Sequence, residues 1–387
     1  MSRQKLTVRV VEERGDLSVR RTLKITDHPD IWFEVSGGIL PPPLEVYDFA
    51  AIAMIYIGMR SGRDVHIEGP VTRQCLKGLA EFQELWINWR LPGYSRVEIT
   101  ANTIVDGQAG ASTVTDGTGI FAYSGGIDGA CAFLRHAGDD LGVRKIKPAG
   151  VMLMHGFDIP VSDDAWFAKA EEDARQGLHE FDIPFCIVRT NWRDFHFGHW
   201  ALEHGAGLFA ALHQFSGAVG WGVIGANEDY RNIVIPWGTS ALFNHFFSGG
   251  RFSIHTECSG MTRCERVEKV CEYPEVAKHI RVCWENKVAG LNCGKCEKCI
   301  RTKLNFMAVG YDPVCFDRPP TALEILGVKA RERMKITYLH EILDEAKARN
   351  LPLTFRAPVF LLMVKSEVFF VLRKIKKALK SRFSRAA

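Results

Sequence analysis

Residues 119–135, GIFAYSGGIDGACAFLR, form the stretch that decides the fold of this chain. The stretch opens with the apolar run 120–123, which has the length and bulk of a buried strand. Gly125 and Gly126 follow, and adjacent glycines let the backbone turn tightly and approach a ligand closely. Residues 129–137 predict a helix whose free N–H groups and positive dipole end point back at that turn. A strand, a glycine turn and a helix N-terminus predict an anion site, most simply for phosphate.

Beyond this stretch the chain alternates between strand-like and helix-like segments. Apolar runs predict strands at residues 150–154, 185–190 and 219–224. Helices are expected between them, at residues 163–180, capped by Ser162, and at residues 204–215. Alternation at this spacing indicates a parallel sheet with helices on both faces. Ligands of such sheets bind outside the carboxyl ends of the strands, which predicts one rim holding Ser124, His155, Asp158, Thr190, Asn191 and Gly225.

The predicted fold class is α/β, a parallel doubly wound sheet with an N-terminal α+β domain and a helical C-terminal extension. The expected domains are residues 1–115, 116–310 and 311–387. Residues 107–117 are rich in Gly, Ser and Thr and suit a linker between the first two. The N-terminal region has no chemical motif, so we expect it to select substrate, form a dimer contact or cover the next domain.

A second motif lies in residues 281–302, RVCWENKVAGLNCGKCEKCIRT. Overlapping CxxC pairs place Cys293, Cys296 and Cys299 around one centre, Gly294 permits the turn, and Cys283 supplies a fourth thiolate. Four thiolates suit a closed, tetrahedral, structural Zn²⁺ site. An iron–sulfur cluster is a second interpretation, and a redox-active CxxC pair is a third.

Composition limits the classes of function. The 387 residues carry a net charge of +4, but residues 365–387 hold eight Lys or Arg and one Glu, which leaves −3 for the rest. A nearly neutral body gives no support to specific nucleic-acid binding. No apolar segment of the secretory type follows Met1, so we expect a cytoplasmic protein whose eleven cysteines serve as thiols and metal ligands rather than disulfides.

The sequence SGGID at residues 124–128 resembles the SGGxDS signature of the PP-loop family of ATP pyrophosphatases, which split ATP into AMP and pyrophosphate. The resemblance implies that Ser124, Gly125 and Gly126 hold phosphates and that Asp128 is tied to the loop or to Mg²⁺. Gly129 stands where the family has a second Ser, so a hydroxyl donor is lost and the backbone N–H remains. The family also places the adenosine near the end of the next strand, which implicates His155 and Asp158. A cap or turn is the equal alternative for both residues. Gly225 is expected to bind the nucleotide from its place at the same rim.

The two motifs together resemble 7-cyano-7-deazaguanine synthase and its relatives. Those enzymes adenylate a carboxylate, convert it to an amide and then a nitrile, and carry a four-cysteine zinc site, which here implies Cys283, Cys293, Cys296 and Cys299. The resemblance covers residues 115–310, and the additional N-terminal region favours a relative with another substrate. It implies ATP, Mg²⁺ and Zn²⁺ as cofactors, and a small-molecule acceptor and a nitrogen donor as partners. Whether the chain forms a homodimer stays open.

Two other functions stay open. A PP-loop sulfurtransferase would need an essential thiol outside the zinc set, for which Cys186, Cys258 and Cys264 are candidates, although buried small residues are the simpler interpretation. A non-catalytic nucleotide-binding protein is favoured only by Gly129. Arg263, Arg266 and Lys269 could hold a carboxylate or phosphates, or could be ordinary packing on a helix.

The C-terminal tail combines apolar and basic residues. Apolar runs at 359–364 and 368–372 precede the basic positions 373, 374, 376, 377 and 380. This composition suits contact with an anionic membrane surface, and it is too short and interrupted to span a bilayer. A docking helix followed by a frayed basic end is the other interpretation.

Overall fold

A computed structural model describes residues 5–106, 115–138, 141–195, 199–283, 285 and 292–383. Most of the linker predicted at residues 107–117 lies outside these ranges. The strands of the described residues are β1 (Leu6–Arg14), β2 (Ser18–Ile25), β3 (Ile31–Gly37), β4 (Val65–Thr72), β5 (Ile99–Val105), β6 (Thr115–Ala122), β7 (Lys147–His155), β8 (Phe185–Thr190), β9 (Val219–Gly225) and β10 (Ser253–Glu257). The helices are α1 (Asp48–Ser61), α2 (Arg73–Asn88), α3 (Ile127–Ala137), α4 (Asp164–Gly177), α5 (Trp200–Leu212), α6 (Arg263–Cys271), α7 (Pro274–Lys278), α8 (Glu297–Ala308), α9 (Ala322–Gly327), α10 (Arg333–Ala348) and α11 (Leu353–Phe383).

All ten strands belong to one sheet, in the order β10-β9-β6-β7-β8-β3-β2-β1-β4-β5. The five strands from β10 to β8 are mutually parallel. The alternation of strands and helices predicts four of them, and β10 is an additional strand that was not predicted. β8, β3, β2 and β1 are joined by antiparallel pairing, and β1, β4 and β5 are again parallel. The fold is therefore α/β with a mostly parallel sheet, compatible with a doubly wound arrangement.

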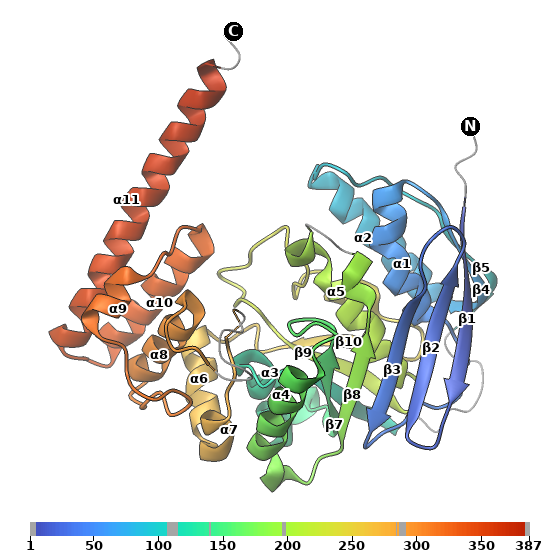
Figure 1. The fold of residues 1–387 in the computed structure, drawn as a ribbon, viewed down its shortest axis with the longest axis horizontal. Helices are drawn as coiled ribbons and strands as arrows, with labels where there is room; N and C mark the ends of the chain where they lie inside the picture. The colour runs from blue at the N-terminus through green and yellow to red at the C-terminus, as the bar shows by residue number, and fades with distance from the viewer. Residues whose placement is uncertain are drawn as a thin grey trace.

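Helices cover both faces of the sheet (Figure 1). Neighbouring residues on one strand point to opposite faces, so Val151 and Leu153 of β7 belong to the core that contains α3, α4 and α6, whereas Met152 belongs to the core that contains α1, α2 and α5. Strands buried on both faces read as continuous apolar runs, which explains the sequence signal at residues 150–154.

The N-terminal strands extend the same sheet. β3 pairs with β8 from Phe33 opposite Thr190 to Gly37 opposite Cys186, and α1 packs against α5 in one shared core. The proposed domain boundary near residue 115 stays a prediction, but the segments on its two sides share a sheet and a core. The N-terminal segment therefore contributes to the scaffold that holds the strand ends.

The N-cap of one helix differs from the sequence expectation. The N-cap of α4 is Asp163, whose side chain accepts from the Trp166 N–H at 3.2 Å, and not Ser162. The C-terminal residues form helices α9 and α10, as expected, and then one helix, α11, which projects away from the rest of the chain (Figure 1). The predicted boundary at residue 310 falls after α8 and stays a prediction.

Candidate functional site

The loop between β6 and α3 has the backbone of a nest for an anion. Gly125 has φ +75°, a conformation that favours glycine, and Gly126 is the N-cap of α3. The carbonyl of Gly125 accepts from the Arg281 N–H at 2.8 Å, which fixes the loop against the segment before the cysteine motif. Gly125 and Arg281, which are 156 positions apart in the sequence, therefore fix the shape of this loop together.

The backbone N–H groups of residues 124–129 have no hydrogen-bond acceptor among the described residues. The preceding N–H, of Tyr123, donates to the Met152 carbonyl at 2.8 Å, and the following one, of Ala130, donates to Gly126 at 3.0 Å. Free N–H groups at the start of a helix, combined with its dipole, attract a phosphate or carboxylate. The loop can therefore offer several donors to one anion.

The loop opens onto a cavity of about 440 Å³ at the carboxyl ends of the strands. Gly125 is not part of its lining, whereas these other predicted residues are: Ser124, Gly126, Asp128, Gly129, Asp158, Gly225 and Cys283. Part of the lining forms an aromatic wall, with Trp200 packed edge-on to Phe157 at 4.9 Å between ring centroids and Trp237 beside His204 at 6.1 Å. Such a wall suits a planar heterocycle. The cavity thus combines residues suited to an anion with apolar, aromatic ones.

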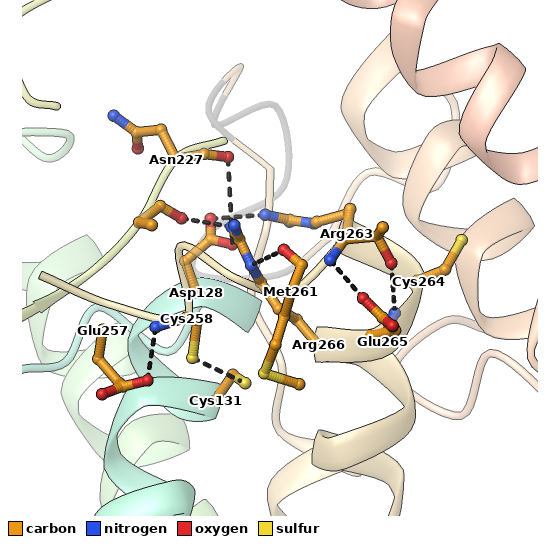
Figure 2. Close-up of polar contacts among 12 residues, drawn as sticks. Asp128, Cys131, Asn227, Glu257, Cys258, Met261, Arg263, Cys264, Glu265 and Arg266 are labelled. Carbon is orange, nitrogen blue, oxygen red and sulfur yellow. Dashed lines mark hydrogen bonds and ion pairs between the residues drawn. The ribbon is translucent and has the colours of Figure 1, made fainter. Parts of the chain in front are cut away.

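Asp128 is held by two arginines of α6 (Figure 2). Its carboxylate accepts from Arg263 at 2.5 Å and from Arg266 at 2.9 Å, and the arginine side chains are 7% and 1% exposed. Burial alone would raise the pKa of Asp128, but the charges and hydrogen bonds of Arg263 and Arg266 outweigh it and hold this pKa below its ordinary value. Each carboxylate oxygen of Asp128 therefore already accepts from an arginine.

This pairing also revises the interpretation of the basic cluster on α6. Arg263 and Arg266 bind Asp128, and Arg266 also donates to the carbonyls of Ala226 and Asn227. Lys269 pairs with Glu272 at 2.7 Å instead. Arg263 nevertheless lines the cavity, and its buried Nε has no hydrogen-bond partner among the described residues. An anion in the cavity would supply the acceptor that this nitrogen lacks.

Two glycines of the site are explained by close packing. A Cβ on Gly129 would lie 2.8 Å from the Ala122 carbonyl oxygen, so a serine at this position would force α3 away from β6. A Cβ on Gly225 would lie 2.2 Å from the carbonyl oxygen of Asp128. The departure at Gly129 from the SGGxDS pattern therefore has a packing reason in this chain.

Three residues expected at the rim face elsewhere. His155 is buried against α4, with its ring stacked on Phe167 at 4.2 Å and its Nε2 on the Pro160 carbonyl at 2.9 Å, and it does not line the cavity. Thr190 and Asn191 hold β3 instead, because Thr190 donates to the Trp32 carbonyl at 2.6 Å and Asn191 accepts from the Trp32 N–H at 3.0 Å. The sequence predicts a strand at residues 31–35, but it does not show that this strand, β3, pairs with β8 and lies beside Thr190 and Asn191.

Lys298 is a site residue that the sequence reasoning missed. It lies in the first turn of α8, between Cys296 and Cys299, and it lines the cavity. Burial lowers the pKa of this amine, while the negative charge of Asp158, another lining residue, acts in the opposite direction. The sign available in the sequence was that Lys298 stands inside the cysteine motif. It was overlooked because a lysine is not one of the metal ligands of that motif.

Glu228 follows β9 beside the Asp128–Arg266 pair and was also missed. Burial and then the negative charge of Asp128 raise the pKa of Glu228 to about 7. A carboxyl whose pKa is higher in the folded state stabilises the fold at low pH. That contribution is complete below its unfolded pKa of about 4.3 and is lost as pH rises through the folded value.

We therefore predict that Glu228→Gln flattens the fall in stability with rising pH. The difference in free energy of unfolding, variant minus wild type, should be on the order of 2 kcal/mol larger at about pH 8 than at about pH 5. Urea unfolding at both pH values measures this gain. Glu81→Gln, an exposed position on α2, is the control and should leave the pH dependence unchanged. A parallel pH dependence in wild type and Glu228→Gln would contradict the assignment.

The four cysteines of the second motif lie close together. Their sulfur atoms are all within 4.8 Å of one another, with Cys283 and Cys296 at 4.0 Å and Cys293 and Cys299 at 3.8 Å. Tetrahedral Zn²⁺ with Zn–S bonds of about 2.3 Å requires sulfurs about 3.8 Å apart. The N–H groups of Cys296 and Cys299 point at the sulfurs of Cys293 and Cys296, each at 3.4 Å, and help to orient the thiols. The arrangement is compatible with a metal site.

A second cluster, His136, His255 and Glu257, also has ligand atoms close together. The Ile146 N–H donates to His136 Nδ1 at 2.9 Å, so Nε2 of the neutral ring carries the proton and donates to Glu257 at 3.2 Å. Glu257 also binds Arg135 at 2.5 Å. Burial would raise the pKa of Glu257, but these hydrogen bonds and charges hold it well below its usual range. The cluster is therefore better described as a hydrogen-bonded network than as a metal site.

The thiols outside the tetrad do not reach the cavity. Among the described lining residues the only cysteine is Cys283. Cys186, Cys258 and Cys264 are buried in the cores, and burial raises the pKa of Cys186 to about 11. Cys258 contacts Cys131, with 3.1 Å between their sulfur atoms. None of the three is presented to a ligand in the cavity.

Comparison with known proteins identifies no relative. No family model matches the chain, and neither the curated proteins nor the solved structures contain a match.

Proposed function

We propose that this protein is an ATP-dependent adenylating enzyme of the PP-loop pyrophosphatase type. It converts ATP to AMP and pyrophosphate, activates a carboxylate-type acceptor and supports formation of an amide- or nitrile-type bond with a nitrogen donor. The observation that carries the proposal is that the N–H groups of residues 124–129 have no hydrogen-bond acceptor among the described residues, in a loop that lines a cavity together with Arg263 and Lys298.

The proposed reaction uses both the anion-binding and the aromatic residues of the cavity lining. The adenine ring lies against the aromatic wall, and the phosphates lie against the loop and the N-terminus of α3. An acceptor oxygen attacks the α-phosphorus and pyrophosphate leaves, with the loop N–H groups and the cations of Arg263 and Lys298 stabilising the charge that develops on the phosphate oxygens. Asp128 positions Arg263 and Arg266 rather than touching ATP. The nitrogen donor then displaces AMP from the acyl group.

Mg²⁺ and Zn²⁺ are treated differently in this proposal. Mg²⁺ would offset phosphate charge, but Asp128 is committed to two arginines, so no step is assigned to a metal held there. Zn²⁺ fits the tetrad of Cys283, Cys293, Cys296 and Cys299, because four thiol sulfurs at tetrahedral spacing suit a closed structural site. Such a site would anchor the start of α8 and so place Lys298 at the cavity.

The alternatives receive less support from the geometry. A sulfurtransferase would need a free thiol near the activated atom, whereas Cys186, Cys258 and Cys264 lie away from the described cavity lining. A decayed, non-catalytic loop was suggested only by Gly129, for which close packing against Ala122 gives a sufficient reason. We therefore favour adenylation and C–N bond formation.

The products of ATP test the proposal. Zinc-loaded protein incubated with ATP and a pool of small carboxylates should form AMP and pyrophosphate. Chromatography measures both products. Lys298→Ala should lower kcat/KM for AMP formation about 10²-fold, the loss typical of removing one group that stabilises developing charge. Ser124→Ala should also slow the reaction without affecting the fold, since Ser124 is exposed.

The matched control is Lys295→Ala, which removes an exposed lysine from the same cysteine motif and outside the cavity lining. It should retain wild-type turnover. Formation of ADP and phosphate instead of AMP would contradict the proposal. Equal rates of AMP formation in Lys298→Ala and Lys295→Ala would also contradict it. ATP bound tightly and left intact by every acceptor would favour the binding protein.

A further inference from the structure

Helix α11 has two apolar faces, of which the chain itself covers one. Phe355, Val359 and Leu362 are buried against the neighbouring helices α9 and α10, and the Ser366 hydroxyl donates to the Leu362 carbonyl on the same side. The helix then continues away from the rest of the chain (Figure 1). The buried side anchors α11, so its opposite side points outward.

That outward side carries an apolar stripe of large residues, each 40–59% exposed: Leu361, Val364, Val368, Val371, Leu372 and Ile375. At 3.6 residues per turn they fall within an arc of about 100° and extend over about 21 Å. Every charged residue between positions 353 and 376 falls outside this arc. A contiguous exposed apolar stripe of this kind marks a surface that contacts something else.

Basic residues border the stripe. Lys376 lies beside one edge, Lys374 and Glu367 lie beside the other, where Glu367 pairs with Arg333, and Arg373 lies on the opposite side of the helix. Residues 365–387 carry a net charge of +7, whereas the rest of the chain carries −3. An apolar face bordered by lysines, with basic residues behind it, is the pattern of a helix that lies in the plane of an anionic membrane surface.

We propose that α11 is a lipid-binding helix that lays its apolar stripe on an anionic membrane surface. No helix in the described part of the chain is long and apolar enough to cross a membrane, so the helix rests on the surface and does not span it. The charge favours this occupant over a second copy of the chain, because parallel pairing of two such helices would bring two segments of net charge +7 together. The stripe is also wider than the seam of a two-helix coiled coil.

Sedimentation with vesicles tests the proposal on the full chain. Binding to phosphatidylcholine vesicles that contain about 30% phosphatidylglycerol should exceed binding to pure phosphatidylcholine about 100-fold at about 0.05 M salt, and it should weaken at about 0.5 M salt. The double variant Val368→Glu with Leu372→Glu should lose at least about 10-fold in binding, because it places two charges in the stripe. The triple variant Arg373→Ala, Lys374→Ala and Lys376→Ala should lose most of the preference for anionic vesicles.

Val143→Glu is the matched control, because Val143 is fully exposed and lies far along the chain from α11. It should bind vesicles as the wild type does. Thermal unfolding should be the same in all variants, since every substituted side chain is exposed.

Absence of vesicle binding by the wild type, or unchanged binding by the stripe variant, would overturn the proposal. The proposal would also fail if the wild type bound no vesicles and sedimentation equilibrium showed a dimer that the stripe substitutions dissociate. That result would assign the stripe to a second copy of the chain. AMP formation from ATP does not enter this test, so the proposed function and the membrane contact fail separately.

Discussion

The Cys296→Ser variant is expected to lose bound zinc and the fold of the region around α8. Structural Zn²⁺ sites contribute about 10–16 kcal/mol of binding free energy, and a whole domain is stable by only about 5–15 kcal/mol. Cys296 is buried, its Sγ lies 4.0 Å from that of Cys283, and its side chain caps α8 by accepting from the Cys299 N–H. Removing this ligand therefore breaks the metal site and the start of the helix together.

Metal analysis and thermal unfolding measure the effect. The wild type should contain one zinc per chain, and a chelator should reproduce the destabilisation of Cys296→Ser. Cys315→Ser, a nearby cysteine outside the tetrad, should keep both the zinc and the unfolding temperature. Iron in place of zinc would select the cluster interpretation. Wild-type stability in metal-free protein would leave the tetrad without a structural role.

The Asp128→Ala variant is expected to be destabilised by about 3–5 kcal/mol, because it leaves the buried cations of Arg263 and Arg266 without their partner. The effect on ATP turnover would then be a consequence of unfolding and not a measure of catalysis. Urea unfolding should show the loss at neutral pH. For this reason Lys298→Ala is the better probe of the reaction.

The pH dependence supplies the second readout for Asp128. Its pKa is lower in the folded state, so its contribution is present above the unfolded pKa of about 3.9 and is lost as pH falls through the folded value. The stability difference between wild type and Asp128→Ala should therefore shrink below about pH 4. Asp163→Ala, which removes only a helix cap, should cost about 1 kcal/mol and serves as the control. A loss in Asp128→Ala no larger than in this control would contradict the buried pair.

The local elements could be predicted because their causes are local. The apolar run before Ser124, the two glycines and the helix that follows are adjacent in sequence, so periodicity and turn chemistry reveal them. The cysteine spacing likewise predicted a cluster, because a CxxC turn brings its own sulfurs together. Element ends were less well predicted, as the cap of α4 at Asp163 shows.

The site could be predicted only in part. Ser124, Gly126, Gly129 and Gly225 do line one cavity, as parallel strands with a common carboxyl edge require. His155 turns away because its strand ends against α4, where Phe167 stacks on the ring. The direction of one side chain at a strand end depends on its neighbours in space, which periodicity does not specify.

By itself, the sequence determined the strand, glycine turn and helix around residues 120–137, the clustering of the four cysteines and the apolar and basic character of α11. Only the tertiary structure decided that the N-terminal strands join the same sheet through β3 and β8, that Asp128 pairs with Arg263 and Arg266, and that Lys298 reaches the cavity. These contacts join residues more than 100 positions apart. Local propensities describe a residue's own segment, whereas pairing between distant segments depends on the free energy of packing the whole chain.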